Sequence, residues 1–234
     1  MIKNIVFDLG GVIITLGQEQ AISRFEALGL HDARERLDAY TQSGIFGDLE
    51  RGDIDAETFR QELSKLVGHE VTYEQCRYAW LGYCHELPQR NLDALRQLRS
   101  EGYRLILLSN TNPYMMSWVM SDEFDGQGHS LADYMDVCYE SYKCHMLKPS
   151  PEIFSHMLME EGIYPEETLF VDDGPRNVAA ASQMGIRTYC PENGADWTKE
   201  IYNYLNLTTI KNERNQKDLD DGDSFIIYHL SFII

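Results

Sequence analysis

A carboxylate stands at the end of the first apolar run of the chain. The apolar residues 5–7 lead into Asp8, and the pair Gly10 and Gly11 then turns the chain away. Folds of the α/β class bind their ligands at the carboxyl ends of buried parallel strands, so the pattern predicts a nucleophilic or metal-binding aspartate. Gly10 stands where a partner acid would be expected, and it has no side chain that transfers a proton.

Three further groups of polar residues fall where later apolar runs end. Ser109 and Asn110 close the second run, Lys148 follows the third, and Asp172 and Asp173 close the fourth. Each residue type is common. Their joint placement at successive strand ends is the specific signal, because parallel strands bring their carboxyl ends to one edge of a sheet.

These groups have a shared chemistry. Three neighbouring carboxylates, Asp8, Asp172 and Asp173, repel one another and require a cation or a proton. Oxygen ligands with few carboxylates suit Mg²⁺, which also binds substrate phosphate. Lys148 would supply a point charge to phosphate oxygens, and Ser109 with nearby backbone N–H groups would bind another. Asp8 is then placed to attack phosphorus and to form an aspartyl-phosphate that water hydrolyses.

The elements that position these groups alternate along the chain. Besides the strand that ends at Asp8, buried strands are predicted at residues 103–109, 136–140, 168–172 and 186–190. Helices are predicted at residues 89–101, 151–161 and 175–184, the last two with Pro at the start and Gly after the end. This alternation predicts an α/β fold with a doubly wound parallel sheet.

Residues 16–87 interrupt this alternation, and no strand pattern is evident in them. Amphipathic helices are predicted at residues 21–28, 33–40, 56–66 and 73–80. A connection of this length in a compact domain is usually functional, often as a lid. A decorative or dimerising subdomain is the alternative.

Composition limits the partners. The chain has 234 residues and a net charge of −18 without one concentrated acidic run, which disfavours nucleic acid and anionic membranes as partners. The five cysteines form no C-x-x-C pair, so we expect reduced thiols and a cytoplasmic protein. A small phosphorylated substrate is expected, with a monomer or a homodimer. Residues 208–234, apolar over 225–234, form a tail to which no role is assigned.

The four motifs resemble those of the haloacid dehalogenase superfamily, in the branch that has a helical cap inserted after the first strand. The resemblance covers roughly residues 2–207. It implies a Rossmann-like core formed by residues 1–15 and 88–207, with strand order 5-4-1-2-3, and a helical cap formed by residues 16–87.

The resemblance also implies a role for each site residue. Asp8 would be the nucleophile, and Lys148 would orient the phosphoryl group. Mg²⁺ would be bound by Asp8, the carbonyl of Gly10 and Asp173, with Asp172 acting through water. The phosphoryl group itself would be bound by Ser109 and Asn110.

Gly10 departs from the pattern of the superfamily's phosphatases, which usually carry a second Asp there as general acid and base. The string Asp-Leu-Gly-Gly-Val at residues 8–12 resembles a bacterial sub-branch that includes glucose-1-phosphate phosphatases. An anomeric phosphate has a better leaving group than an alkyl phosphate, so such a substrate would need the acid less.

Two other functions compete with the phosphatase. The 2-haloacid dehalogenases also lack the second Asp and need no metal, but Asp172 and Asp173 beside the nucleophile are costly without a cation. A weakly active or inactive relative that binds a phosphorylated ligand or a protein partner would also explain Gly10.

The predicted cap contains further candidates. Phe46, Trp80 and Tyr83 would face a sugar, although packing in a helical core is the ordinary role of such residues. Residues 44–47 are expected to form a flexible loop that enters the site. Asp48 or Glu50 nearby would then replace the acid missing at Gly10.

Overall fold

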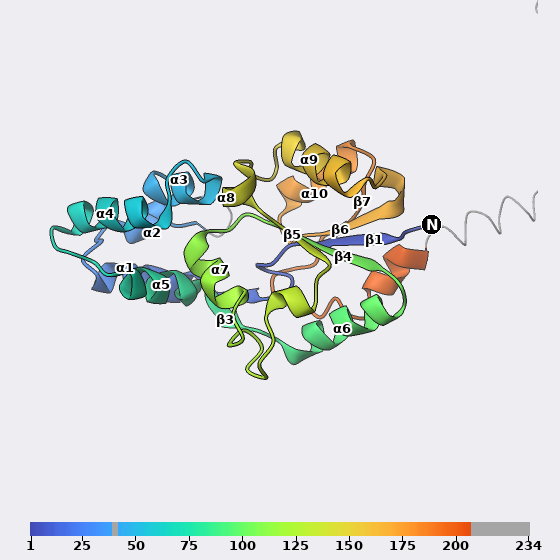
Figure 1. Ribbon diagram of the computed structural model, residues 1–234, viewed down its shortest axis with the longest axis horizontal. Coiled ribbons are helices and arrows are strands. Elements are labelled where there is room, and N and C mark those ends of the chain that lie inside the picture. Colours follow the sequence, from blue (N-terminus) through green and yellow to red (C-terminus); the bar gives the residue numbers. More distant parts are fainter. Residues whose placement is uncertain (39–41, 207–234) are drawn as a thin grey trace, which may run out of the picture.

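The computed structural model describes residues 1–38 and 42–206. The predicted tail, residues 208–234 with its apolar end, lies outside the described residues. The described chain forms two lobes, one built around a sheet and one built of helices (Figure 1).

A five-stranded parallel sheet forms the first lobe, in the order β5-β4-β1-β6-β7. Its strands are β1 (Asn4–Phe7), β4 (Arg104–Ser109), β5 (Val137–Glu140), β6 (Thr168–Val171) and β7 (Arg187–Tyr189). Numbered among themselves along the chain and followed from β7, these strands have the order 5-4-1-2-3. The predicted fold class and strand order are therefore confirmed.

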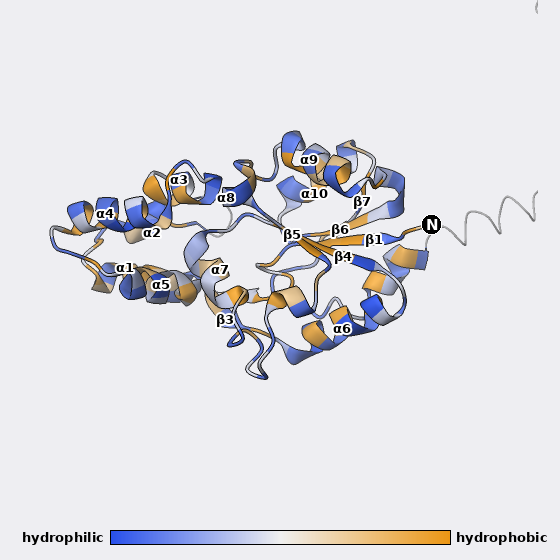
Figure 2. Cartoon of the chain, in the orientation of Figure 1, coloured by the Kyte–Doolittle hydropathy of each residue, from blue (hydrophilic) through white to orange (hydrophobic). Residues whose placement is uncertain are grey.

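Both faces of the sheet are buried, as expected for parallel strands. Alternate residues of β1 point to opposite faces, so that Ile5 and Phe7 join one hydrophobic cluster while Val6 joins the other. Helix α6 (Gln89–Ser100) packs on the first face, whereas α9 (Pro151–Glu161) and α10 (Pro175–Gln183) pack on the second. Figure 2 shows the central strands as hydrophobic and the outer sides of these helices as hydrophilic.

The remaining elements of this lobe are short. They are α7 (Pro113–Val119), η2 (Leu131–Asp133), α8 (Ser141–Cys144) and η3 (Pro165–Glu167). The three helices predicted around the sheet occur within one residue of the expected ends. Helix α9 begins at Pro151, and Gly162 follows it in the left-handed conformation with φ 62°.

Helices dominate the second lobe. They are α1 (Gln18–Ala27), α2 (Ala33–Arg36), α3 (Ile45–Arg51), α4 (Ala56–Val67), α5 (Tyr73–Trp80) and η1 (Leu81–Tyr83). Their buried side chains form a hydrophobic cluster of their own, which Tyr114 and Met115 of α7 join. This cluster supports the division into core and cap, whose boundaries stay a prediction.

The helices predicted at residues 56–66 and 73–80 are present as α4 and α5, but the helix predicted at residues 33–40 ends at Arg36, because Leu37 is extended. Two further predictions for this lobe were wrong. Residues 44–47 do not form a flexible loop, because α3 begins at Ile45 and buries Phe46. The Phe46 ring lies 5.1 Å from the rings of Phe25 and Phe59, and this packing outweighs the low helix propensity of the glycines. The region also contains strand residues, since β2 (Thr15–Leu16) pairs antiparallel with β3 (Cys84–Glu86) where the chain enters and leaves the lobe.

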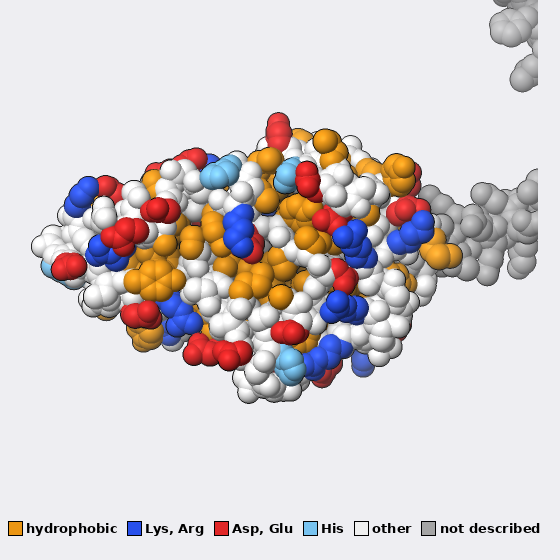
Figure 3. All heavy atoms as spheres, viewed as in Figure 1, with side chains coloured by type: hydrophobic (Ala, Val, Ile, Leu, Met, Phe, Trp, Pro, Cys, Tyr) orange, Lys and Arg blue, Asp and Glu red, His pale blue; other side chains and the backbone are white. Residues whose placement is uncertain are grey.

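Acidic and basic side chains are interspersed over the face shown in Figure 3. Within the part of the chain that the structure describes, no helix is both long and apolar enough to cross a membrane.

Candidate active site

The predicted site residues meet at the carboxyl edge of the sheet. Asp8 follows β1, Ser109 ends β4, and the pair Asp172 and Asp173 follows β6. Because β4 and β6 flank β1 in parallel, these three strand ends lie side by side. Lys148, from the segment between α8 and α9, completes the group.

Three carboxylates surround one ammonium group. Asp8, Asp172 and Asp173 each offer an oxygen, and these atoms all lie within 4.8 Å of one another. Lys148 Nζ lies 2.9 Å from Asp8 Oδ2 and 2.6 Å from Asp172 Oδ2, and the side chain of Lys148 is fully buried. One positive charge cannot balance three negative charges, so this cluster has a place for a further cation.

The charges in the cluster shift its pKa values. Burial raises the pKa of Asp8, Lys148 opposes this, and Asp172 and Asp173 add to it. Burial, followed by the charge of Asp172, raises the pKa of Asp173 to about 6. Burial alone would lower the pKa of Lys148, but Asp172 and Asp8 raise it above its ordinary value. Lys148 therefore stays charged.

The two neighbouring acids have different surroundings. Asp172 accepts hydrogen bonds from Lys148, from the Gly174 N–H at 2.8 Å and from Asn177 Nδ2 at 3.0 Å. For the Asp173 carboxylate, no side-chain hydrogen-bond donor is found among the described residues, and the one donor is its own backbone N–H. Asp173 lines a cavity together with Asp8. The donor set, with carboxylate oxygens that lack enough protein cations, fits Mg²⁺.

The loop after β1 is shaped around Asp173. Gly11 has φ 75°, and a Cβ atom at this position would collide with the Asp173 carboxylate. The loop is also fastened from distant parts of the chain. Trp197 Nε1 donates to the Val12 carbonyl at 2.8 Å, and Asn91 Nδ2 donates to the same oxygen at 3.0 Å.

Gly10 has no side chain, and another residue occupies the space that a side chain at position 10 would fill. A Cβ atom at Gly10 would lie 2.8 Å from Leu16 Cδ1. Leu16 is the second residue of β2 and lines the same cavities as Gly10. A carboxylate at position 10 would therefore fit only after the end of the Leu16 side chain moved.

Asn110 and Ser109 are placed differently with respect to a phosphoryl group. The side-chain amide of Asn110 is bonded at both ends to the backbone of Lys148. Ser109 Oγ has one contact, to the Asn110 carbonyl at 3.5 Å, the limit of a hydrogen bond. Ser109 thus has a hydroxyl to offer to a phosphate, whereas Asn110 has its backbone N–H and the second hydrogen of Nδ2.

Side chains of the helical lobe close the cavity over the strand ends. A cavity of about 70 Å³ is lined on one side by Gly10, Ser109 and Asn110. The helical lobe contributes its opposite wall, which consists of Gln42, Glu50, Trp80 and Tyr83. Trp80 Nε1 is buried without a hydrogen-bond partner among the described residues.

The candidate residues of the helical lobe differ in whether their side chains reach the cavities. Phe46 is buried in the helical core, while Trp80 and Tyr83 reach the cavity. Asp48 forms an ion pair with Arg51 and does not line the cavities around the acidic cluster. Glu50, also on α3, faces Asp8 across a second cavity of about 60 Å³.

Several supporting residues were not recognised in the sequence. They are Leu16, Gln42, Asn91, Asn177 and Trp197. A local signal existed for Asn177 alone, because it lies in the first turn of α10, directly after the acid pair. Gln42, Asn91 and Trp197 come from distant parts of the chain, and Leu16 is placed by the pairing of β2 with β3, so only the fold identifies these four.

Comparison with known proteins agrees with this geometry. Residues 2–185 match the haloacid dehalogenase-like hydrolase family. The chain is 48% identical over 206 residues to the D-ribitol-5-phosphate phosphatase of Bacteroides thetaiotaomicron, covering 88% of this chain and 100% of that protein. The protein is thereby established as a hydrolase with a Rossmann-like fold. The chain belongs to the haloacid dehalogenase-like hydrolase family, as its motifs predict.

Two solved structures share the fold closely. A HAD-like hydrolase from Porphyromonas gingivalis superposes with a TM-score of 0.83 at 47% identity, covering 88% of this chain and 98% of that one. A HAD family enzyme from Bacteroides thetaiotaomicron, crystallised with magnesium and inorganic phosphate, superposes with a TM-score of 0.78 at 38% identity. This match covers 84% of the present chain and 98% of the other.

Proposed function

We propose that the protein is a Mg²⁺-dependent phosphatase that hydrolyses a small sugar or alditol phosphate through an aspartyl-phosphate on Asp8. The observation that carries the proposal is the cluster in which Lys148 joins Asp8 and Asp172 beside Asp173. The relatives confirm the predicted phosphatase class and the predicted Mg²⁺ cofactor. A single nucleophilic carboxylate, a buried ammonium and a cation site together suit phosphoryl transfer.

Asp8, the Gly10 carbonyl and Asp173 would hold Mg²⁺, with Asp172 acting through a water. Asp172 already accepts hydrogen bonds from Lys148 and Asn177, which supports a water-mediated role for it in Mg²⁺ binding. When bound, the ion neutralises charge on the phosphoryl oxygens.

Each residue of the site then has its own role in the reaction. Lys148 orients Asp8 and offers its charge to a phosphoryl oxygen, while Ser109 Oγ and the Asn110 N–H donate to others. A carboxylate oxygen of Asp8 attacks phosphorus, and the bond from phosphorus to the leaving oxygen breaks as that oxygen gains a proton. Water then attacks phosphorus, releases inorganic phosphate and restores Asp8.

The helical lobe supports a polyol as the leaving group. Three polar side chains, Gln42, Glu50 and Tyr83, line a small cavity beside Ser109. A hydroxylated chain satisfies such groups, whereas an apolar chain would leave the Glu50 carboxyl group without a partner. The named relative acts on an alditol phosphate, and so we favour this class over the sugar 1-phosphate that the first motif suggested.

The proposal also covers the cellular location and the oligomeric state of the enzyme. A cytoplasmic location is supported by the five cysteines, which form no disulfide. A monomer or a homodimer remains the expectation for the assembly.

Steady-state hydrolysis of D-ribitol 5-phosphate and p-nitrophenyl phosphate, with Mg²⁺ and with EDTA, tests the proposal. We expect turnover that EDTA abolishes and that Asp8→Asn lowers to background, while Asp122→Asn, at an exposed position, leaves it unchanged. A wild-type protein as inactive as Asp8→Asn would favour a binding function. Chloride release from 2-chloropropionate without metal would instead establish a dehalogenase.

A further inference from the structure

We propose that Glu50, a residue of the helical lobe, is the general acid and base of the reaction, a role that Gly10 cannot fill. Glu50 donates a proton to the leaving oxygen and then accepts a proton from the attacking water. The inference rests on the proposed phosphatase function and deepens it. Glu50 would be a catalytic residue in the strict sense, because its carboxyl group contacts the reacting atoms.

The placement of Glu50 carries the argument. It lies near the end of α3, yet it lines both cavities at the strand ends, one shared with Ser109 and the other with Asp8 and Lys148. Outside the Asp8, Asp172 and Asp173 cluster, no other carboxylate of the described residues lines these two cavities.

The backbone of Glu50 is fixed to the sheet lobe. Ser141 Oγ donates to the Glu50 carbonyl at 2.6 Å and accepts from the Thr111 N–H at 3.0 Å. Thr111 follows Ser109 and Asn110 directly. One hydroxyl group thus ties the helix that carries Glu50 to the loop that would bind the phosphoryl group.

The Glu50 carboxyl group is buried and uncommitted. The residue is 9% exposed, and no hydrogen bond or ion pair of its side chain is found among the described residues. A buried carboxylate without a partner is costly, so the site has a reason other than stability to keep it. Leu16, meanwhile, fills the space beside Gly10 from which the usual acid would extend.

The charges around Glu50 favour its protonated form. Asp8, Asp173 and Lys148 face it across the cavity, Arg51 is its neighbour on α3, and Tyr83 faces it from η1. Burial, then the charge of Asp8, raises the pKa of Glu50 to about 8, against a lowering by Arg51. Bound Mg²⁺ would offset the charge of Asp8, but the effect of burial would remain.

The two steps balance. In the first, Asp8 bonds to phosphorus, the bond from phosphorus to the leaving oxygen breaks, and the Glu50 proton passes to that oxygen. In the second, water bonds to phosphorus, the bond from phosphorus to Asp8 breaks, and Glu50 takes the proton of the water. Glu50 and Asp8 both return to their starting states.

The test is Glu50→Gln, assayed with Mg²⁺ on two substrates. Gln resembles protonated Glu in shape but donates no proton. For D-ribitol 5-phosphate, whose leaving alkoxide needs a proton, we expect kcat/KM to fall about 10²–10⁴-fold, the usual size of general acid–base catalysis. For p-nitrophenyl phosphate, whose leaving group departs without a proton, kcat/KM should fall less than about tenfold.

The second step gives a readout besides turnover. With p-nitrophenyl phosphate, Glu50→Gln should release p-nitrophenolate in a burst and accumulate phosphorylated Asp8, detectable by mass spectrometry after an acid quench. The alkaline decline of kcat/KM for D-ribitol 5-phosphate should disappear in the variant. Asp48→Asn on the same helix is the matched control, and its rates should equal those of the wild type.

Three outcomes would overturn the inference. Equal losses of kcat/KM on both substrates would indicate that Glu50 serves binding, and weaker Mg²⁺ binding by calorimetry would indicate a metal ligand. Unchanged rates would remove Glu50 from the reaction while leaving the phosphatase intact, whereas absent wild-type turnover would instead defeat the proposed function. If Glu50→Gln does not fold, a steep dependence of wild-type kcat/KM on leaving-group pKa across aryl phosphates contradicts a proton donor.

Discussion

The side-chain amide of Asn110 exchanges two hydrogen bonds of 2.9 Å with the backbone of Lys148. Nδ2 donates to the Lys148 carbonyl, and Oδ1 accepts from the Lys148 N–H. The strand end that bears Ser109 thereby fixes the segment that delivers the buried ammonium to Asp8 and Asp172. Asn110 thus positions Lys148 as well as offering a backbone donor.

Asn110→Ala should therefore lower kcat more than it raises KM. Lys148 would lose both anchors of its backbone, and a misplacement of about 1 Å at a catalytic group costs on the order of 10²-fold in rate. Steady-state kinetics with D-ribitol 5-phosphate measure the effect, with the exposed Asn203→Ala as control. A rise in KM alone would show that the amide serves substrate binding.

Mg²⁺ should stabilise the protein more at high pH than at low pH. Folding raises the pKa of Asp8 and Asp173, the latter to about 6. Between the ordinary aspartate pKa of about 4 and these raised values, the native metal-free protein binds more protons than the unfolded chain, so this contribution to stability falls as pH rises. Mg²⁺ competes with those protons.

Thermal unfolding with and without Mg²⁺ at about pH 5 and pH 8 measures this linkage. We expect the larger rise in Tm at pH 8, and Asp173→Asn should lose most of that rise. An equal rise in Tm at both pH values would show that Mg²⁺ binds away from these carboxylates.

Gly11→Ala should weaken both folding and Mg²⁺ binding. The residue has a positive φ and lies against Asp173, so an added methyl group displaces that carboxylate. Gly102→Ala is a matched control, because Gly102 also has a positive φ, of 91°, but no atom of the described residues lies within 4 Å of its Cβ position. Both variants should lower Tm, whereas only Gly11→Ala should lower Mg²⁺ affinity in calorimetry. Equal Mg²⁺ affinities would contradict the close packing of Gly11 on Asp173.

An aspartate introduced by Gly10→Asp should take over the proton transfer that we assign to Glu50. Leu16 Cδ1 occupies the space, so Leu16→Ala is needed to admit the carboxylate. In a Glu50→Gln background, Gly10→Asp with Leu16→Ala should recover kcat/KM on D-ribitol 5-phosphate by at least about tenfold, part of the general acid–base effect. Leu16→Ala alone in that background should recover none, and equal recovery in both would refute the assignment.

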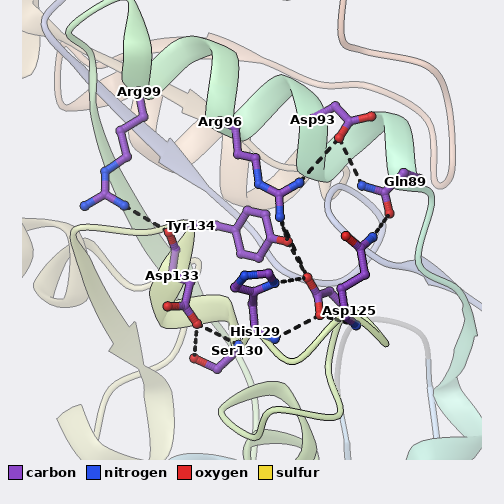
Figure 4. Close-up of polar contacts among 10 residues, drawn as sticks. Gln89, Asp93, Arg96, Arg99, Asp125, His129, Ser130, Asp133 and Tyr134 are labelled. Carbon is purple, nitrogen blue, oxygen red and sulfur yellow. Dashed lines mark hydrogen bonds and ion pairs between the residues drawn. The ribbon is translucent and has the colours of Figure 1, made fainter.

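Asp125 should stabilise the fold without contributing to catalysis. Its side chain is fully buried and accepts hydrogen bonds from Tyr134, His129 and the Gln127 N–H, with Arg96 3.8 Å away (Figure 4). Burial alone would raise the pKa of Asp125, but these hydrogen bonds lower it below its ordinary value. The resulting stability is present above pH about 4 and declines as pH falls toward the lowered pKa.

Asp125→Asn should accordingly lower Tm at neutral pH with kcat unchanged, and the difference in Tm from the wild type should narrow in acid. Asp122→Asn, an exposed change in the same segment, is the control. If the Tm of Asp125→Asn fell further below that of the wild type as the pH fell, the Asp125 carboxylate would not stabilise the fold through a lowered pKa.

The sheet and its strand ends could be predicted because the sequence encodes them locally. Apolar runs close at Asp8, Ser109 and Asp172, and Pro and Gly mark the helix ends at residues 151 and 162. These signals do not depend on the rest of the fold, so the predicted strands agree with the structure, whereas their order was predicted from the family resemblance. The roles assigned to the individual site residues stay predictions.

Helix α3 of the helical lobe was not predicted, because its formation depends on distant contacts. Helix α3 contains a glycine and follows another, and the rings of Phe25, Phe59 and Trp80 around Phe46 stabilise it. The orientation of Glu50 follows from that helix. A flexible loop was therefore the wrong prediction for residues 44–47, although Glu50 itself was among the candidates.

The central position of β1 also governs the order in which the protein assembles during synthesis. The strand that leads to Asp8 is made before its pairing partners, residues 104–107 and 168–171, which follow much later in the chain. The brace from Trp197 to Val12 comes later still. Until those partners are made, the nascent chain therefore carries an apolar strand with two open edges, which makes binding by a chaperone advantageous.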